Sequence, residues 1–418
     1  MLSLRYGTQT LPLPPSVEGL VALTREEPAP LGDPLAALRE ALTRPVAGPS
    51  LAEHVAGRRK VGVILPDGTR PLPTMLVEGL LDALGAVPKV VRIANGTHRR
   101  TTPAEHQSML GRHFSKVEVG DRATDDPAGH VALPGSDRSI DRVAAECDAL
   151  VLMGPMAFHY LAGFGGGGKL VAPGLSDRAT AEFVHSACLA PEGGRHPLAK
   201  AGVVEGNPLR ERLEAVCRAA PPQFYVIPLL DSAYRPVAFF TGERNAAFQA
   251  AARALSDSYG VSCARHSTVI ACAGGHPYDI DFVQAHKAWE MANAACKPGG
   301  TILWIARCPE GLPNRHRAFL EKHRTAREME KALRERFDIA AHTVWAARAK
   351  AEQQRVLALT EMPREVVTAL GMEKVEGLDA ALRSMSLEDA VLLPLGSRFL
   401  PVARQANLEI RGARLRNL

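Results

Sequence analysis

The stretch K-V-G-V-I-L-P-D-G-T-R-P, residues 60–71, decides the fold class, because a short β-rich apolar run ends in a polar loop. Residues 60–65 have the Val and Ile content of a strand, and residues 74–84 then follow a helical pattern. The order repeats at residues 89–94, K-V-V-R-I-A, which run straight into N-G-T-H-R-R. Short strands that alternate with helices predict an α/β protein.

Further segments continue this alternation along the chain. The remaining expected strands cover residues 149–154, 223–229, 267–273, 301–306, 355–360 and 390–395. The remaining expected helices cover residues 139–148, 182–188, 281–296 and 315–337. The second start at residue 267 indicates a boundary near residues 258–266. We therefore predict two α/β domains, residues 1–262 and a smaller one over residues 263–418, with the active site in the cleft between them.

The composition is that of a globular protein, with 418 residues, 46% hydrophobic and 23% charged. No window approaches the ~20 apolar residues of a membrane span, and the N-terminus lacks the pattern of a secretory signal, so we expect a cytoplasmic protein without a membrane partner. Acids and bases alternate in residues 315–337, which indicates solvated helix faces rather than a nucleic-acid surface. The seven cysteines are dispersed without a C-x-x-C pair, which argues against disulfides and a thiolate zinc site.

Polar residues follow the first two predicted strands, at the sheet edge where ligands bind in open α/β folds. In D-G-T-R-P, Arg70 offers a planar fork for a carboxylate or phosphate, and Gly68 lets the backbone come close to a ligand. His98 lies just beyond the second strand. Each feature alone also fits a plain turn or a structural histidine.

The stretch G-F-G-G-G-G-K-L, residues 163–170, fits a phosphate-binding P-loop at every position but the last, where Leu170 replaces Ser or Thr. A P-loop also needs a strand directly before the glycines and a helix opening at the lysine. Here the predicted strand ends at residue 154, and L-V-A-P-G cannot extend a long helix. This disfavours a nucleotide-binding phosphotransferase built on Gly163–Lys169. It leaves Lys169 on a flexible backbone, where its amine suits a covalent bond to a cofactor or substrate.

Two more histidines and a helical pair complete the candidate residues. His159 and His185 lie on either side of Lys169 in the sequence, and either could serve as an acid–base group or a metal ligand. No H-E-x-x-H spacing supports a zinc hydrolase. Gln284 and Lys287 are three residues apart on a predicted helix and therefore share a face, although many helices carry such pairs without a catalytic role.

In their order and spacing, these motifs resemble the lactate racemase family, whose members use a nickel-pincer nucleotide. The match extends over residues 67–287. It comprises D-G-T-R-P, N-G-T-H-R, a histidine ten residues before the lysine of G-G-G-K, a histidine sixteen residues after it, and Q-x-x-K.

The resemblance implies a role for each matched residue. Lys169 matches the lysine that forms a thioamide linkage to a pyridinium mononucleotide with two sulfur arms, and His185 matches the nickel ligand. His98 and His159 match the two acid–base histidines. The residues that match contacts to the cofactor and substrate are Asp67, Gly68, Thr69, Arg70, Gln284 and Lys287.

The implied function is that of an isomerase, a racemase or epimerase that inverts C2 of a 2-hydroxy acid by hydride transfer. Arg70 and Lys287 would hold the substrate carboxylate, and the partners would include enzymes of cofactor biosynthesis and nickel insertion. Val283 stands where lactate-specific members are expected to have an aromatic residue, so the pocket is expected to be wider or differently shaped. Trp345 could line the pocket or belong to the core. A redox enzyme that releases the oxo acid and a cofactor carrier remain as alternatives.

Overall fold

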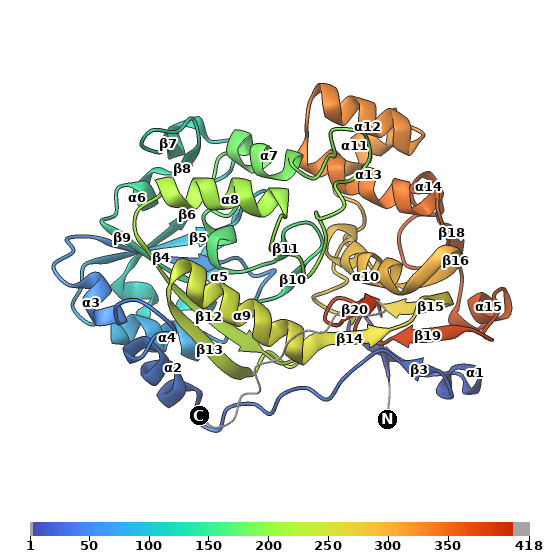
Figure 1. Ribbon diagram of the computed structural model, residues 1–418, viewed down its shortest axis with the longest axis horizontal. Helices are drawn as coiled ribbons and strands as arrows, with labels where there is room; N and C mark the ends of the chain where they lie inside the picture. Colours follow the sequence, from blue (N-terminus) through green and yellow to red (C-terminus); the bar gives the residue numbers. More distant parts are fainter. Residues whose placement is uncertain (1–2, 404–418) are drawn as a thin grey trace.

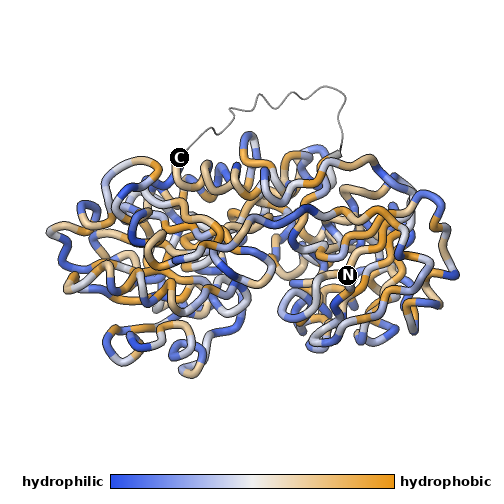
Figure 2. Tube along the Cα trace, turned by 90° about the horizontal axis from the view of Figure 1, so that it is seen from below, coloured by the Kyte–Doolittle hydropathy of each residue, from blue (hydrophilic) through white to orange (hydrophobic). Residues whose placement is uncertain are grey.

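The computed structural model describes residues 3–403, which form two lobes, each around a six-stranded sheet (Figure 1). Figure 2 shows the apolar segments, in orange, gathered inside each lobe. The strands alternate with helices, so the predicted α/β class is confirmed. Within the described residues, no helix is long and apolar enough to cross a membrane.

The sheet of the first lobe is parallel except for its edge strand β13, and its order is β13-β12-β9-β4-β5-β6. The strands are β4 (Val61–Pro66), β5 (Lys89–Ala94), β6 (Glu118–Asp121), β9 (Ala149–Met153), β12 (Gln223–Leu230) and β13 (Pro236–Glu243). Every residue of β4 and β9 is buried, because both strands lie in the middle of the sheet with helices on both faces. Burial on both faces explains their near-continuous apolar sequences.

Helices cover both faces of this sheet. Val63 and Leu65 of β4 join one apolar cluster, and Ile64 between them joins the other, as strand geometry requires. The first cluster is completed by α2 (Pro34–Thr43), α3 (Leu51–Val55), α4 (Thr74–Ala83) and the end of α5 (Pro103–Leu110). The second includes α7 (Arg178–Ser186), α8 (Pro208–Ala219) and α9 (Arg244–Tyr259) and continues into the second lobe.

The chain reverses its direction across the sheet between β4 and β9. From β4 it moves outward to β5 and β6, and it then returns to β9 and β12 on the other side. Because β4 and β9 are neighbouring parallel strands, the loops that follow them leave the sheet side by side. This switch point is where open α/β sheets bind ligands.

The sheet of the second lobe is parallel throughout, with the order β18-β17-β16-β15-β19-β3. Its strands are β3 (Val21–Ala22), β15 (His266–Cys272), β16 (Cys296–Ile305), β17 (Arg355–Leu359), β18 (Glu373–Val375) and β19 (Ala390–Leu393). Its helices are α10 (Phe282–Ala295), α11 (Asn314–Lys322), α12 (Ala326–Glu335), α13 (Ile339–Ala351), α14 (Arg364–Ala369) and α15 (Leu378–Arg383). Between the lobes, β14 (Gly260–Cys263) follows α9 and pairs with β20 (Leu400–Ala403).

The first residues of the chain lie in the second lobe, although the sequence assigned residues 1–262 to the first domain. Val21 of β3 pairs with Val391, and Leu4 packs in the same apolar cluster as Ile270. The elements of this segment are β1 (Leu4–Tyr6), β2 (Gln9–Leu11) and α1 (Pro15–Glu18). Residues 404–418 of the predicted second domain lie outside the described residues.

One predicted element is wrong, whereas the other predicted strands and helices are found with shifted ends. Residues 139–148 were expected to be helical, but they form β8 (Ser139–Asp141), which pairs with β7 (His130–Ala132), followed by the short helix α6 (Arg142–Ala145). Asp141 explains the break, because its carboxylate accepts from the Ala144 amide at the start of α6 and from the Arg92 guanidinium.

Candidate active site

The matched residues of the first lobe lie on loops that follow adjacent strands. Asp67 comes directly after β4, and His98 follows β5. The segment after β9 contains a small hairpin, β10 (Phe158–His159) with β11 (Gly163–Phe164), and then the 3-10 turn η3 (Gly167–Leu170). The sheet topology therefore gathers these loops at one edge.

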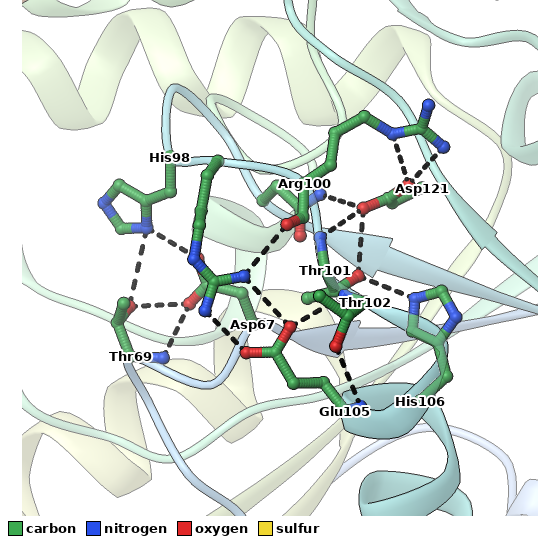
Figure 3. Close-up of polar contacts among 11 residues, drawn as sticks. Asp67, Thr69, His98, Arg100, Thr101, Thr102, Glu105, His106 and Asp121 are labelled. Carbon is green, nitrogen blue, oxygen red and sulfur yellow. Dashed lines mark hydrogen bonds and ion pairs between the residues drawn. The ribbon is translucent and has the colours of Figure 1, made fainter.

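Asp67 and His98 form a hydrogen-bonded pair (Figure 3). Asp67 is buried, and its Oδ2 lies 2.6 Å from Nδ1 of His98. A carboxylate only accepts, so Nδ1 carries the proton and Nε2 keeps a free lone pair. Oδ1 accepts from the hydroxyl of Thr69 at 2.6 Å and from its amide at 3.1 Å. Burial alone would raise the pKa of Asp67, but the charge and hydrogen bond of His98 hold it below its usual range.

A second hydrogen-bond network fastens the loop that carries His98 (Figure 3). Asp121, at the end of β6, accepts from Arg100 Nε at 2.8 Å, from the Thr101 amide at 2.7 Å and from the Asn95 side chain. These contacts lie on both sides of His98 in the sequence. They limit the movement of the loop and so help to fix the position of the imidazole relative to Asp67.

His159 is buried in the hairpin and has a different hydrogen-bond environment from His98. Its Nδ1 accepts from the backbone amides of Leu161, at 3.2 Å, and Ala162, at 3.1 Å. The neutral ring therefore carries its proton on Nε2. Desolvation, followed by the positive charge of Lys169, lowers the pKa of His159 well below its ordinary value. His159 is thus held as a neutral donor.

The glycine run is closely packed, so the expected flexible backbone at Lys169 is wrong. Gly167 has φ +51°, and a Cβ there would lie 2.7 Å from the Tyr225 ring. A Cβ on Gly168 would lie 2.7 Å from Cys217 Sγ, on α8. The run lets the backbone approach β12 and α8, and η3, of four residues, is too short to present a P-loop helix to phosphate.

Lys169 lies among positive charges. Desolvation lowers its pKa well below the ordinary value, and the charges of Arg70, Arg210 and Lys287 lower it further. Within residues 3–403, we find no ion pair for any of these four side chains; the polar contacts are from Arg70 to Thr69 Oγ1 and from Lys287 to a neighbouring amide. A neutral amine is the nucleophilic form, and the positive side chains gathered here favour an anionic ligand.

His185, on α7, is oriented as a metal ligand would be. Its Nδ1 donates to the Ala181 carbonyl at 2.8 Å, which leaves the lone pair of Nε2 free. Desolvation lowers its pKa well below the ordinary value, so the ring is neutral. In the part of the chain described, no three His, Cys, Asp or Glu side chains are arranged to hold a metal. A metal bound by His185 would therefore need further ligands from a bound molecule.

Gln284 and Lys287 come from α10 of the second lobe. The Lys287 amine donates to the Gln284 side-chain oxygen, and the Asp281 carboxylate caps the helix at the Gln284 amide, at 2.7 Å. Desolvation, with the positive charge of Arg70, lowers the pKa of Lys287 to about 7. The shared face predicted from their spacing is confirmed.

Contacts across the two lobes surround this region. The Tyr160 hydroxyl, next to His159, lies 2.7 Å from Nε2 of His342 on α13, and the His342 ring lies 5.7 Å from that of His185. Trp345, one turn further along α13, is buried in the core, as one of its two predicted placements required. Val283 is partly buried beside Gln284.

Sequence patterns did not predict three residues of this region, Tyr160, Arg210 and His342. Tyr160 and His342 become informative only through their contact between the lobes. Arg210 is one of several charged residues in α8, and no spacing marks it. Its place near Lys169 depends on how α8 packs against η3.

Comparisons with known proteins match two parts of the chain to the domains of one family. Residues 6–195 match the lactate racemase N-terminal domain, and residues 261–390 match the lactate racemase C-terminal domain. The chain is 29% identical over 284 residues to a lactate racemase of Thermoanaerobacterium thermosaccharolyticum and 28% identical over 287 residues to one of Lactiplantibacillus plantarum. Each alignment covers 66% of this chain and 66% of the relative, slightly less than two thirds.

Two solved structures share the fold. The lactate racemase apoprotein of T. thermosaccharolyticum has a TM-score of 0.84 at 22% identity, with 97% of this chain and 100% of that chain covered. A protein of Thermotoga maritima has a TM-score of 0.68 at 17% identity, with 91% and 100% covered. At these identities the structural likeness supports the fold alone.

Proposed function

The chain belongs to the lactate racemase family, and from that premise we propose that it inverts C2 of a 2-hydroxy acid by reversible hydride transfer. Its relatives indicate an isomerase of the racemase type that acts on a small molecule. The proposed cofactor is a nickel-pincer nucleotide attached to Lys169. The observation that carries the proposal is the group of positively charged side chains around an amine whose pKa is lowered.

The residues present fit such a cofactor. Lys169 can form the covalent link because its lowered pKa favours the neutral, nucleophilic form of the amine. His185 has a free Nε2 for nickel, a metal that imidazole and sulfur ligands suit. When bound, the cofactor would accept and return the hydride and would supply the remaining nickel ligands. Nickel-insertion and cofactor-making enzymes are therefore the proposed partners.

The substrate carboxylate would be held by Arg70 and Lys287. Binding an anion raises the pKa of Lys287, which is lowered in the free protein, so the amine would be charged in the complex. Gln284, already bonded to Lys287, would fix the direction of that amine. Because Arg70 and Lys287 come from different lobes, the carboxylate would bind only when the lobes are together.

The two histidines would handle the hydroxyl proton. His98 Nε2 would accept it while the Asp67 carboxylate stabilises the imidazolium that forms, and loss of the C2 hydride would leave the 2-oxo acid. His159 Nε2–H would donate to the substrate oxygen. For the opposite enantiomer, His159 would become the base, which requires its proton on Nδ1. That change displaces the amides of Leu161 and Ala162 from the ring.

Contact between the lobes would protect the reaction from water. The Tyr160–His342 hydrogen bond joins the first-lobe hairpin to α13 of the second lobe, beside His185. Water excluded from this region cannot compete for the hydride or hydrate the 2-oxo acid.

The proposal is tested by intact mass and nickel content of protein co-produced with the cofactor-making enzymes. We expect an adduct mapped to Lys169, with stoichiometric nickel, and interconversion of the enantiomers of a 2-hydroxy acid. Lys169→Ala should carry no adduct. An unmodified Lys169, in cells where a known lactate racemase is loaded, would refute the proposal.

A further inference from the structure

Arg210 is a buried arginine without a polar partner. It is 4% exposed, and its Nε, Nη1 and Nη2 are all buried with no hydrogen-bond partner. Arg92 is equally buried but is hydrogen-bonded to the Asp141 carboxylate through Nε and Nη2. Burying an unpaired guanidinium is costly. A buried guanidinium that the protein itself leaves without a hydrogen-bond partner is therefore a candidate to bind an anionic ligand.

No acidic side chain of the described residues forms an ion pair or hydrogen bond with Arg210, although the Glu214 carboxylate acts on it electrostatically. Glu214, one turn further along α8, lies 3.3 Å from the Arg244 guanidinium. The N-terminal amides of α8 are not free for a ligand either, because Asn207 Oδ1 accepts from the amides of Leu209 and Arg210. The side chain of Arg210, rather than the helix terminus, is therefore the available donor.

Arg210 lies beside the turn that carries Lys169. Its guanidinium stacks 3.8 Å above the Phe248 ring, and the same ring lies 3.2 Å from the position of a Cβ on Gly167. Gly168 meets Leu213, from the turn of α8 that follows Arg210, with 2.8 Å from its Cβ position to Leu213 Cδ2. Phe248 and α8 thus place the guanidinium next to η3.

We propose that Arg210 binds the phosphate of the nucleotide tethered to Lys169. This inference rests on the proposed function and adds a site for the part of the cofactor furthest from the reaction. A planar guanidinium with five N–H donors matches phosphate oxygens in pairs. Phe248 lies against the guanidinium, and its three nitrogens remain buried and unpaired, so phosphate would have to enter the packing around them.

The first test measures thermal unfolding of the full-length apoprotein with and without inorganic phosphate. Phosphate should raise the Tm of the wild type and leave that of Arg210→Met unchanged. Without phosphate, Arg210→Met should unfold at a higher temperature than the wild type, because the unpaired charge is gone. If Arg210 instead stabilises the fold by packing on Phe248, Arg210→Met should have a lower Tm than the wild type. That result would overturn the inference.

Two controls separate Arg210 from its surroundings. Arg212→Met removes a partnered arginine of the same helix, whose Nη1 donates to the Phe183 carbonyl, and should keep the phosphate response. Lys287→Met should also keep it. A response lost in Lys287→Met but retained in Arg210→Met would place phosphate in the substrate site and refute the assignment.

The second test compares adduct formation on Lys169 by intact mass after co-production. Arg210→Met should carry several-fold less adduct than the wild type at equal expression. If it does not fold, Arg210→Lys keeps a charge without the planar fork and should bind phosphate about tenfold more weakly than the wild type. A wild type without an adduct on Lys169 would refute the proposed function. In that case the phosphate titration would still show whether Arg210 binds phosphate. Equal loading and an equal phosphate response would refute the Arg210 inference alone.

Discussion

Replacement of Asp67 by Asn should change the tautomer of His98. The amide has the shape of the carboxylate but one of its two groups is a donor. If the NH2 group faced Thr69, it would oppose the Thr69 backbone amide, a fixed donor 3.1 Å from Oδ1. The NH2 group therefore faces His98, which can accept by moving its proton to Nε2. In Asp67→Asn the atom that should remove the substrate proton is already protonated.

The magnitude of this effect follows from the lost charge and the altered tautomer. A hydrogen bond to a charged group contributes about 1.5–3 kcal/mol, and the same exchange in a buried serine-protease triad lowers kcat by about 10⁴-fold. The His98 side chain is 28% exposed, so water can replace part of what Asp67 supplies. We expect kcat to fall by about 10²–10³-fold, which is roughly 3–4 kcal/mol.

The assay is the interconversion of 2-hydroxy acid enantiomers, followed by chiral chromatography and normalised to the adduct on Lys169. Asp148→Asn is the matched control, because that carboxylate accepts from the amides of Arg59 and Lys60 at the opposite end of β4. It should lower stability but keep the rate per loaded enzyme. A fully loaded Asp67→Asn that keeps a rate within about threefold of the wild type would refute the assigned role of the Asp67–His98 pair.

Three further predictions follow from the site. The pKa of Lys287 in the folded protein is about 7, below its ordinary value of 10.5, so between these pH values the unfolded state binds more protons. The free energy of unfolding of the apoprotein should therefore fall as the pH is lowered from about 10.5 to about 7. Urea unfolding of Lys287→Met should lack this part of the pH dependence. His159→Gln can still donate to the substrate oxygen, so its kcat/KM should exceed that of His159→Ala by about tenfold; equal rates would contradict the donor role. Tyr160→Phe leaves Nε2 of His342 without its donor and should lower the free energy of unfolding by about 1–3 kcal/mol in urea titrations, with nickel content unchanged.

The sequence predicts the position of the site where local patterns decide the structure. β4 and β5 are buried in the sheet, so their sequences are mostly apolar, with Arg92 as the buried exception in β5, and their polar loops begin abruptly after Pro66 and Ala94. The Gln284–Lys287 pair follows equally from helical spacing. These local rules needed no knowledge of the rest of the chain.

What the sequence does not predict depends on contacts between distant segments. β3 joins the second sheet through a pairing of Val21 with Val391, which no local pattern marks. Residues 139–148 break into a strand and a short helix because Asp141 is held by Arg92, from β5. The different tautomers of His98 and His159 arise from a carboxylate on one loop and two amides on another.

The glycine run explains why a P-loop pattern can appear in a site of another kind. In a P-loop, glycines let backbone amides approach a phosphate. Here they let the backbone approach the protein itself, since a Cβ on Gly167 or Gly168 would meet Tyr225 or α8. The proposed cofactor is flat and anionic, and the positively charged side chains around Lys169 would supply for it what backbone amides supply in a P-loop. The same glycine pattern therefore lets the backbone pack closely against the protein here, whereas in a P-loop it lets the backbone amides reach a phosphate.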